Sequence, residues 1–161
     1  MIVVVMGVTG SGKTTVGGLL AKKLSWDFAD GDDFHSTANK EKIKHGIPLT
    51  DADRMPWLAA LHKQVARWIS EKRNTVLACS ALKQSYREHL WTGPEVKFVF
   101  LKGSYQLIYR RLLARKGHFA DEHILVSQFA VLEEPPDAIT VDIGGWPREI
   151  VDEICGRISA A

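Results

Sequence analysis

The sequence predicts a three-layer α/β fold built on a mostly parallel five-stranded sheet. Short apolar runs alternate with longer segments in which apolar residues recur every three or four positions, a pattern typical of parallel strands joined by amphipathic helices. The first apolar run, residues 2–6, leads directly into a glycine-rich stretch and then into a helical pattern. From this architecture we expect the strand order 2-3-1-4-5 in a single domain covering residues 1–161.

The individual elements are expected in chain order. Apolar runs predict strands at residues 2–6, 26–29, 75–79, 97–102 and 139–143. Helical spacing of apolar residues indicates helices around residues 16–24, 107–112, 124–132 and 150–158. Ser36 is expected to cap a short helix that ends at Gly46, and Pro56 to begin a long helix reaching residue 72. Residues 36–72 would then form a helical insertion between the second and third strands, on the substrate side.

Residues 7–14, Gly-Val-Thr-Gly-Ser-Gly-Lys-Thr, match the pattern G-x-x-x-x-G-K-[ST] between a buried strand and a helix. In this context the pattern is a phosphate-binding loop (P-loop), whose glycines let backbone N–H groups face phosphate oxygens at a helix N-terminus. Lys13 is placed to reach the β- and γ-phosphates, and the Thr14 hydroxyl to bind Mg²⁺. We expect a nucleotide to be bound by Gly7, Gly10, Ser11, Gly12, Lys13, Thr14 and Thr15.

Length and composition exclude several classes of protein. With 161 residues, 45% of them hydrophobic and 25% charged, the chain has enough apolar residues for one core. A formal charge of +2 is too small to indicate a nucleic-acid partner. The N-terminal apolar run is too short for a membrane span or a signal peptide. Cys79 and Cys155 are typical of core thiols in a reducing compartment, so we expect a cytoplasmic protein with no membrane partner.

Charged residues cluster where strands of the predicted sheet end. Asp30 and Asp32 follow the second strand, and ligands of open parallel sheets bind outside the carboxyl ends of strands. Lys83 and Arg87 follow the third strand and, being four residues apart, are expected on one face of a helix. The insertion and the segment after the fourth strand contribute further cations: Arg54, Arg111, Arg115 and Lys116.

Two other classes of P-loop protein fit the sequence less well. A GTPase switch would carry an Asn-Lys-x-Asp motif, and the only similar stretch, residues 39–42 (NKEK), lacks the aspartate. The strand at 75–79 also ends without the Mg²⁺-binding aspartate of many ATPases. A small-molecule kinase fits better, because it needs carboxylates and cations around its phosphates and acceptor. Charge alone indicates a hydroxylated acid or a phosphate ester as acceptor.

Over essentially the whole chain the sequence resembles the gluconate kinases (gluconokinases), relatives of shikimate kinase with the P-loop kinase fold. The resemblance rests on blocks in the family's order: Asp30-x-Asp32 with His35; Gly46-x-Pro48-Leu49-x-Asp51-x-Asp53-Arg54 before Pro56-Trp57-Leu58; residues 79–83 (CSALK) with Tyr86-Arg87; residues 115–119 (RKGHF); and Ser127-Gln128-Phe129 with residues 132–135 (LEEP). It implies ATP-dependent phosphorylation of D-gluconate to 6-phospho-D-gluconate by direct in-line phosphoryl transfer, with Mg²⁺ and as a homodimer.

The resemblance also implies a role for each matching residue. Asp32 would be the base or orienter of the acceptor hydroxyl, with Lys13 and Arg115 completing the catalytic set, and Asp30 would be a water-mediated Mg²⁺ partner of Thr14. Arg111 would lie on the adenine or phosphate side. Apart from the resemblance, the place of Trp146 near the C-terminus makes it a candidate to flank the adenine. Gluconate would be held by Asp32, His35, Arg54, Lys83, Arg87 and Gln128. A lid at residues 115–127 would close over the phosphates through Arg115, Lys116 and His118.

Two departures from the family's pattern are visible. Ser36 stands where the family often has proline, and residues 120–123 (ADEH) stand where relatives tend to carry Met-Pro. Both lie outside the cationic positions and bear on lid dynamics more than on chemistry. Two alternatives remain open: a kinase of this fold acting on another hydroxy acid or a nucleoside, and a slow nucleotide-dependent switch that acts through a partner.

Overall fold

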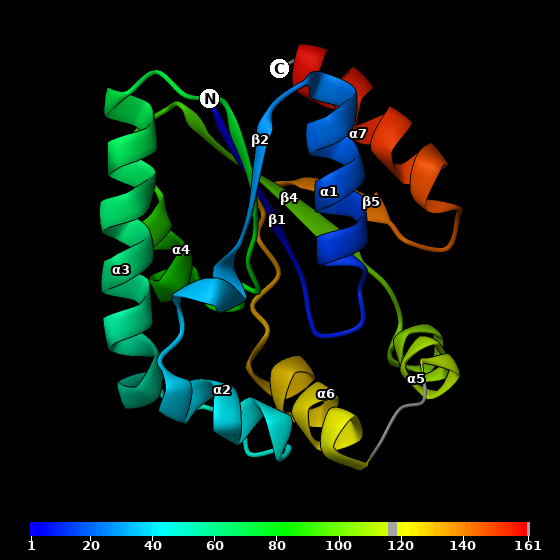
Figure 1. The fold of residues 1–161 in the computed structure, drawn as a ribbon. Coiled ribbons are helices and arrows are strands. Elements are labelled where there is room, and N and C mark those ends of the chain that lie inside the picture. The colour runs from blue at the N-terminus through cyan, green and yellow to red at the C-terminus, as the bar shows by residue number, and fades with distance from the viewer. Residues whose placement is uncertain (116–118, 161) are drawn as a thin grey trace.

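The computed structural model describes residues 1–115 and 119–160, with the backbone alone at residues 119–121. Its strands form one parallel sheet in the order β2-β3-β1-β4-β5, which confirms the predicted fold class and strand order (Figure 1). The strands are β1 (Ile2–Met6), β2 (Asp27–Asp30), β3 (Thr75–Ala78), β4 (Val96–Lys102) and β5 (Ile139–Asp142).

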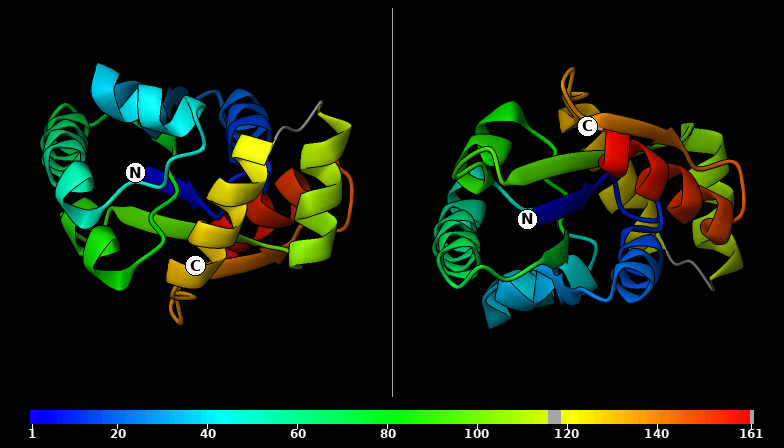
Figure 2. Two further views of the ribbon diagram at one scale, coloured as in Figure 1. Left: turned by 90° about the horizontal axis from the view of Figure 1, so that it is seen from below. Right: turned by 90° about the horizontal axis from the view of Figure 1, so that it is seen from above.

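The helices connect these parallel strands and cover both faces of the sheet. Helices α3 and α4 lie on one face, and α1 and α7 on the other (Figure 2). In chain order the helices are α1 (Lys13–Leu24), the 3₁₀ helix η1 (Gly31–Phe34), α2 (Thr37–Lys44), α3 (Asp51–Ser70), α4 (Gln84–Leu90), α5 (Tyr105–Ala114), α6 (Phe119–Val131) and α7 (Pro147–Ala160).

Strand β1 is buried throughout because each of its faces packs against a different helical layer. Val3 and Val5 belong to the core formed with α1, α5 and α7. Ile2, Val4 and Met6 point the other way, into the core formed with α3 and α4. A strand buried on both faces appears in the sequence as a continuous apolar run, as it does here.

Two expectations about helices were wrong. Helix α3 begins at Asp51, five residues before Pro56, because Thr50 and Asp53 form a capping box that fixes its start. Lys83 and Arg87 do not share a helix face, because Lys83 is the N-cap of α4 and only Arg87 lies within the helix. The expected cap of α2 by Ser36 is present, with its hydroxyl accepting the N–H of Asn39.

The carboxyl ends of the strands gather the loops that the sequence analysis singled out. The P-loop, between β1 and α1, lies at the same end of the sheet as η1, α2 and α6 (Figure 1). Helices α2 and α6, far apart in sequence, are in contact at this end. Within the part of the chain that the structure describes, no helix has the length and apolar character needed to cross a membrane.

Candidate active site

The P-loop has the backbone geometry of a phosphate cradle. Gly10 has φ +77°, and a Cβ at this position would lie 2.8 Å from Leu112 Cδ2, so no other residue fits without rearrangement. The hydroxyl of Ser11 is buried without a hydrogen-bond partner among the described residues. Lys13 Nζ donates to the carbonyl of Val8 at 2.9 Å and so folds back over the loop. The loop fits a phosphate chain, whose oxygens would satisfy donors of this kind.

A cavity of about 580 Å³ opens over the P-loop, within the range of small-molecule sites. The predicted nucleotide residues from Gly10 to Thr15 line it, together with Asp30 and Asp32. Arg111 and Trp146, expected on the nucleotide side, also line this cavity, as does Arg115, expected in the catalytic set and the lid. Arg111 is held in place by donating to the carbonyl of Ile143.

Asp30, at the end of β2, connects the P-loop to the acidic turn. Its Oδ2 accepts a hydrogen bond from the Thr14 hydroxyl at 2.9 Å, and its Oδ1 accepts one from the N–H of Asp32 at 3.0 Å. A hydroxyl and a carboxylate side by side are the oxygen donors that Mg²⁺ accepts. The same carboxylate therefore orients Asp32 and offers, with Thr14, a place for a metal ion.

Asp32 is held over the P-loop by its neighbours in η1. Gly31 lies so close to β3 that a Cβ would meet the Ala78 carbonyl at 2.9 Å, and Trp57 Nε1 donates to the Gly31 carbonyl at 2.7 Å. Partial loss of solvent and the nearby Asp30 charge raise the pKa of Asp32, while Lys13 opposes the shift. Burial lowers the pKa of Lys13 despite the attraction of Asp32. The pair thus places a basic carboxylate opposite the phosphate site.

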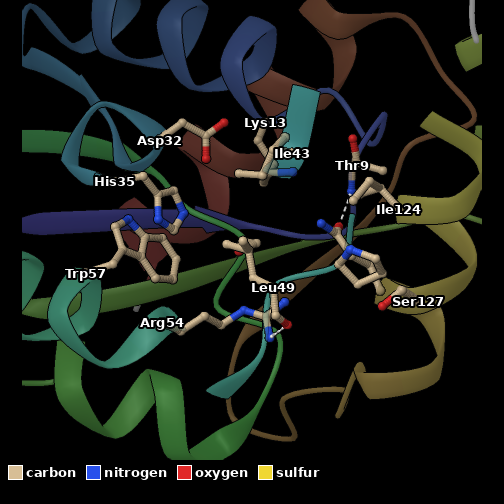
Figure 3. Close-up of a pocket in the computed structure, with 13 residues that line it drawn as sticks. Thr9, Lys13, Asp32, His35, Ile43, Leu49, Arg54, Trp57, Ile124 and Ser127 are labelled. Atoms are coloured by element: carbon tan, nitrogen blue, oxygen red, sulfur yellow. Dashed lines mark hydrogen bonds between the residues drawn. The ribbon is translucent and has the colours of Figure 1, made fainter. Parts of the chain in front are cut away.

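A second cavity lies between η1, α2, α3 and α6 (Figure 3). Thr9, Lys13 and Asp32 line both this cavity and the one over the P-loop, so the two meet at these residues. Four of the residues predicted to bind gluconate line this second cavity: Asp32, His35, Arg54 and Gln128. Apolar residues complete its wall: Ile43, Pro48, Leu49, Trp57 and Ile124.

Arg54 lines this second cavity as a cation in addition to Lys13, and a residue of α4, Tyr86, helps to hold it in place. Its NH1 donates to the Leu49 carbonyl at 2.8 Å and to the Tyr86 hydroxyl at 3.2 Å, and its guanidinium lies 5.3 Å from the Tyr86 ring centroid. Tyr86 in turn donates to Asp51, whose carboxylate also accepts from Lys83 at 3.2 Å. Lys83 is therefore behind Arg54, paired with Asp51, and does not line the cavity.

The structure does not bring Arg87 to either of these cavities. Arg87 is buried, and its NH1 donates to the carbonyls of Ala81 and Leu82 at 2.8 and 3.1 Å. Its NH2 donates to Gln84 Oε1 and to the Glu133 carbonyl at 3.2 and 2.9 Å. The guanidinium therefore joins the β3–α4 loop to the segment after α6. Of the predicted lid residues, Arg115 is exposed beside the P-loop cavity, and Lys116 and His118 lie outside the described residues.

The family model described as shikimate kinase matches residues 9–134, which places the chain in that family of P-loop kinases. The gluconokinase of Gluconobacter oxydans is 48% identical over 98% of this chain and 90% of its own. A probable gluconokinase of Xenopus tropicalis is 47% identical over 98% of this chain and 93% of its own. Within the family, the chain belongs to the gluconokinases. The crystal structure of a gluconokinase from Sinorhizobium meliloti 1021 superposes with a TM-score of 0.88, at 39% identity over 98% of this chain and 91% of that one.

This gluconokinase family member contains site residues that the sequence analysis did not single out. Asn39 is a buried polar residue that contacts His35, and Tyr86 positions Arg54. Trp57 has the helical spacing of a core residue and is buried, yet its indole also lines the second cavity and stacks on His35. The sequence offers one signal for Asn39, a polar residue three positions after the Ser36 cap, but spacing alone does not predict its contact with His35.

Proposed function

We propose that this protein catalyses ATP-dependent phosphorylation of D-gluconate to 6-phospho-D-gluconate by direct in-line phosphoryl transfer. The observation that carries the proposal is that Lys13 and Asp32 line both the P-loop cavity and the second cavity. A nucleotide in the first and a hydroxylated acid in the second would meet at these two side chains. The relatives named gluconokinases support gluconate as the acid.

The proposed step is a single displacement. The terminal hydroxyl oxygen of gluconate forms a bond to the γ-phosphorus of ATP, the bond from that phosphorus to the β–γ bridging oxygen breaks, and ADP leaves. Asp32 accepts the proton of the hydroxyl, for which its raised pKa makes it a better acceptor than an ordinary aspartate. Positioning and charge neutralisation supply most of the rate in reactions of this kind.

Lys13, Arg111 and Arg115 would compensate the charge of the phosphates, since all three line the P-loop cavity. Thr14 and Asp30 would hold Mg²⁺, with Asp30 acting through a water. When bound, Mg²⁺ would neutralise charge on the β- and γ-phosphate oxygens. Among the described residues, no group of three or more His, Cys, Asp or Glu side chains is arranged so that it could hold a metal ion by itself. The Thr14 hydroxyl and the Asp30 carboxylate suit Mg²⁺, because this ion keeps several waters and uses few protein ligands besides substrate phosphates.

Arg54, His35 and Gln128 would hold gluconate, with Arg54 compensating its carboxylate. Lys83 would act through the Asp51–Tyr86 cluster, because its ammonium pairs with Asp51. For Arg87, predicted to bind gluconate, the hydrogen bonds to backbone carbonyls support a structural role. We also propose that residues 36–72 form the substrate-side insertion, that residues 115–127, with Lys116 and His118, form a lid, and that the enzyme is a cytoplasmic homodimer.

A coupled assay for 6-phosphogluconate tests the proposed function. ATP consumption would be compared with gluconate, shikimate or a nucleoside monophosphate as acceptor, and with no acceptor. We expect gluconate alone to stimulate turnover strongly. Turnover with another acceptor but not with gluconate would refute the substrate, and slow hydrolysis that no acceptor stimulates would support a nucleotide-dependent switch instead. Size-exclusion chromatography with light scattering tests the dimer.

A further inference from the structure

Asn39, on α2, is a buried polar residue whose amide orientation is fixed by the backbone. Only 6% of its surface is exposed, and its Nδ2 donates to the carbonyl of Asp53 at 2.8 Å. A carbonyl oxygen only accepts, so the atom facing it must be the amide nitrogen and not the amide oxygen. The orientation of this side chain therefore follows from its hydrogen bonds.

The second N–H of the same nitrogen faces His35, with 3.2 Å between Asn39 Nδ2 and His35 Nδ1. Because Nδ2 can only donate, Nδ1 must be the unprotonated nitrogen of the ring. The proton of a neutral imidazole then resides on Nε2. No side chain or backbone group that the structure describes is hydrogen-bonded to Nε2, and the ring lies at the wall of the second cavity (Figure 3).

The surroundings of His35 also keep the ring uncharged. It stacks on Trp57 with 4.3 Å between ring centroids and 14° between planes. Loss of solvent, and after it the positive charges of Arg54 and Lys40, lower the pKa of His35 from 6.5 to about 4. At neutral pH the ring is then neutral, with one nitrogen committed to Asn39 and the other carrying a proton.

We propose that Asn39 is a positioning residue of the acceptor site, which fixes His35 as a neutral Nε2–H donor for a hydroxyl oxygen of the acceptor. The inference rests on the proposed function, because it assigns the second cavity to a polyhydroxy acid. A ring in this tautomer has no free acceptor nitrogen, so His35 binds a hydroxyl without competing with Asp32 for its proton. The backbone N–H of His35, which donates to the Asp32 carbonyl at 3.2 Å, couples the two residues.

The tautomer is measured directly on the ligand-free protein, and this measurement does not depend on the substrate. Two-bond ¹H–¹⁵N correlation spectra distinguish the two neutral tautomers and the imidazolium, and His35→Gln identifies the His35 signals among those of the six histidines. We expect the Nε2–H form and no protonation between pH 6 and 8. An Nδ1–H form, or protonation near the ordinary pKa of about 6.5, would overturn the inference.

Variants then test what the tautomer does. Asn39→Asp replaces the donor by an acceptor, so we expect Nδ1 of His35 to gain a proton and the KM for gluconate to rise by about tenfold, the effect of losing roughly one hydrogen bond. The KM for ATP should change less than twofold. His35→Gln, which keeps an N–H donor near the Nε2 position, should retain most of the affinity that His35→Leu loses.

The spectra and the Asn39 and His35 variants distinguish a positioning role of Asn39 from an effect on protein stability. They also test this role separately from the proposed function. An unchanged KM for gluconate in a folded Asn39→Asp enzyme, or equal losses in His35→Gln and His35→Leu, would refute the role of the ring. Should Asn39→Asp fail to fold, the spectra of the unmodified protein and the two His35 variants decide the question alone. If the unmodified enzyme did not phosphorylate gluconate, the proposed function would fail while the tautomer result would stand.

Discussion

Gln128 Oε1, on α6, accepts a hydrogen bond from the backbone N–H of Thr9 in the P-loop, with 2.6 Å between oxygen and nitrogen. The two residues are 119 positions apart in the sequence. The contact ties a wall of the second cavity to the loop that receives the phosphates, and it uses only the amide oxygen of Gln128. The amide nitrogen is left to meet a ligand in the cavity that Gln128 lines.

Substitutions of Gln128 can separate its contact with the P-loop, made by the amide oxygen, from its contact with the acceptor, made by the amide nitrogen. Gln128→Glu keeps an oxygen for Thr9 but replaces the amide N–H donor by a negative charge. If Gln128 binds the acid substrate, we expect this variant to raise the KM for gluconate by about tenfold or more, a change of roughly 1.4 kcal/mol. The KM for ATP should be nearly unchanged, and steady-state kinetics with each substrate varied in turn measures both.

Gln128→Leu is the matched variant, because it removes the oxygen as well. It should impair both substrates, since the Thr9 N–H loses its partner. If Gln128→Glu behaves like the unmodified enzyme, Gln128 only holds the P-loop and our assignment to gluconate is wrong.

Replacing Asp32 separates proton transfer from binding. Asp32→Asn keeps the shape of the side chain but cannot accept the proton of the acceptor hydroxyl, so we expect kcat to fall by a factor of about 10² or more. Nucleotide affinity, measured by calorimetry, should stay within a few fold, whereas Lys13→Ala should abolish both binding and turnover. Near-normal turnover of Asp32→Asn would remove the role of base from this residue.

The same substitution should make the protein more stable at neutral pH. The folded pKa of Asp32 is raised, chiefly by desolvation and then by Asp30, so ionisation of this group costs stability once the pH exceeds the ordinary value near 3.8. Asp32→Asn removes that cost, and its melting temperature should exceed that of the unmodified protein at pH 7. The difference should shrink as the pH falls toward 3.8, which thermal unfolding across a pH series measures. Equal melting temperatures at pH 7 would contradict the raised pKa.

The sequence predicts the nucleotide half of this molecule better than the acceptor half. Residues 7–14 form a contiguous motif whose backbone geometry is local, so the pattern alone places Lys13 and Thr14. The apolar run of β1 and the alternation of strands and helices likewise predict the sheet order. The acceptor cavity depends on η1, α2, α3 and α6 meeting at the end of the sheet, which no local pattern contains.

Arg87 illustrates where sequence reasoning stops. Its spacing from Lys83 predicts a shared helix face, but the helix begins after Lys83, and Arg87 turns inward to carbonyls that a helical-spacing argument cannot place. Asn39 is a residue that residue spacing does not single out at all. Its role depends on the Asp53 carbonyl in α3 and on the His35 ring before α2. Long-range hydrogen bonds of this kind are decided by tertiary packing rather than by residue spacing.

If Arg87 has a structural role, its substitution should lower the free energy of unfolding without changing the KM for gluconate. Arg87→Lys keeps the charge but cannot bridge the carbonyls of Ala81, Leu82 and Glu133, so we expect the free energy of unfolding to drop by about 2 kcal/mol. The KM for gluconate of the folded enzyme should remain within twofold. Arg110→Lys, on the exposed side of α5, is the matched control and should be neutral in urea unfolding. A large rise in KM with unchanged stability would instead return Arg87 to the substrate site.

The capping box of α3 should make stability sensitive to acid. A hydrogen bond from Lys42, and after it one from the Thr50 backbone, lower the pKa of Asp53 from 3.8 to about 2. The stabilisation by the ionised carboxylate is therefore complete above about pH 4 and is lost as the pH falls toward 2. We expect Asp53→Asn to be less stable than the unmodified protein at pH 7, and the deficit to narrow through this window.

Thr50→Ala removes the other half of the box and should cost about 1 kcal/mol. Its effect should depend less on pH than that of Asp53→Asn, because the ionisable carboxylate and its main partner, Lys42, remain. Asp137→Asn, at an exposed carboxylate outside α3, is the control for a general loss of negative charge. Denaturant unfolding of the three variants and the unmodified protein at pH values from 2.5 to 7 measures how each loss of stability depends on pH. A deficit of Asp53→Asn that persisted unchanged at the lowest pH would mean that Asp53 stabilises α3 through its shape and not through its charge.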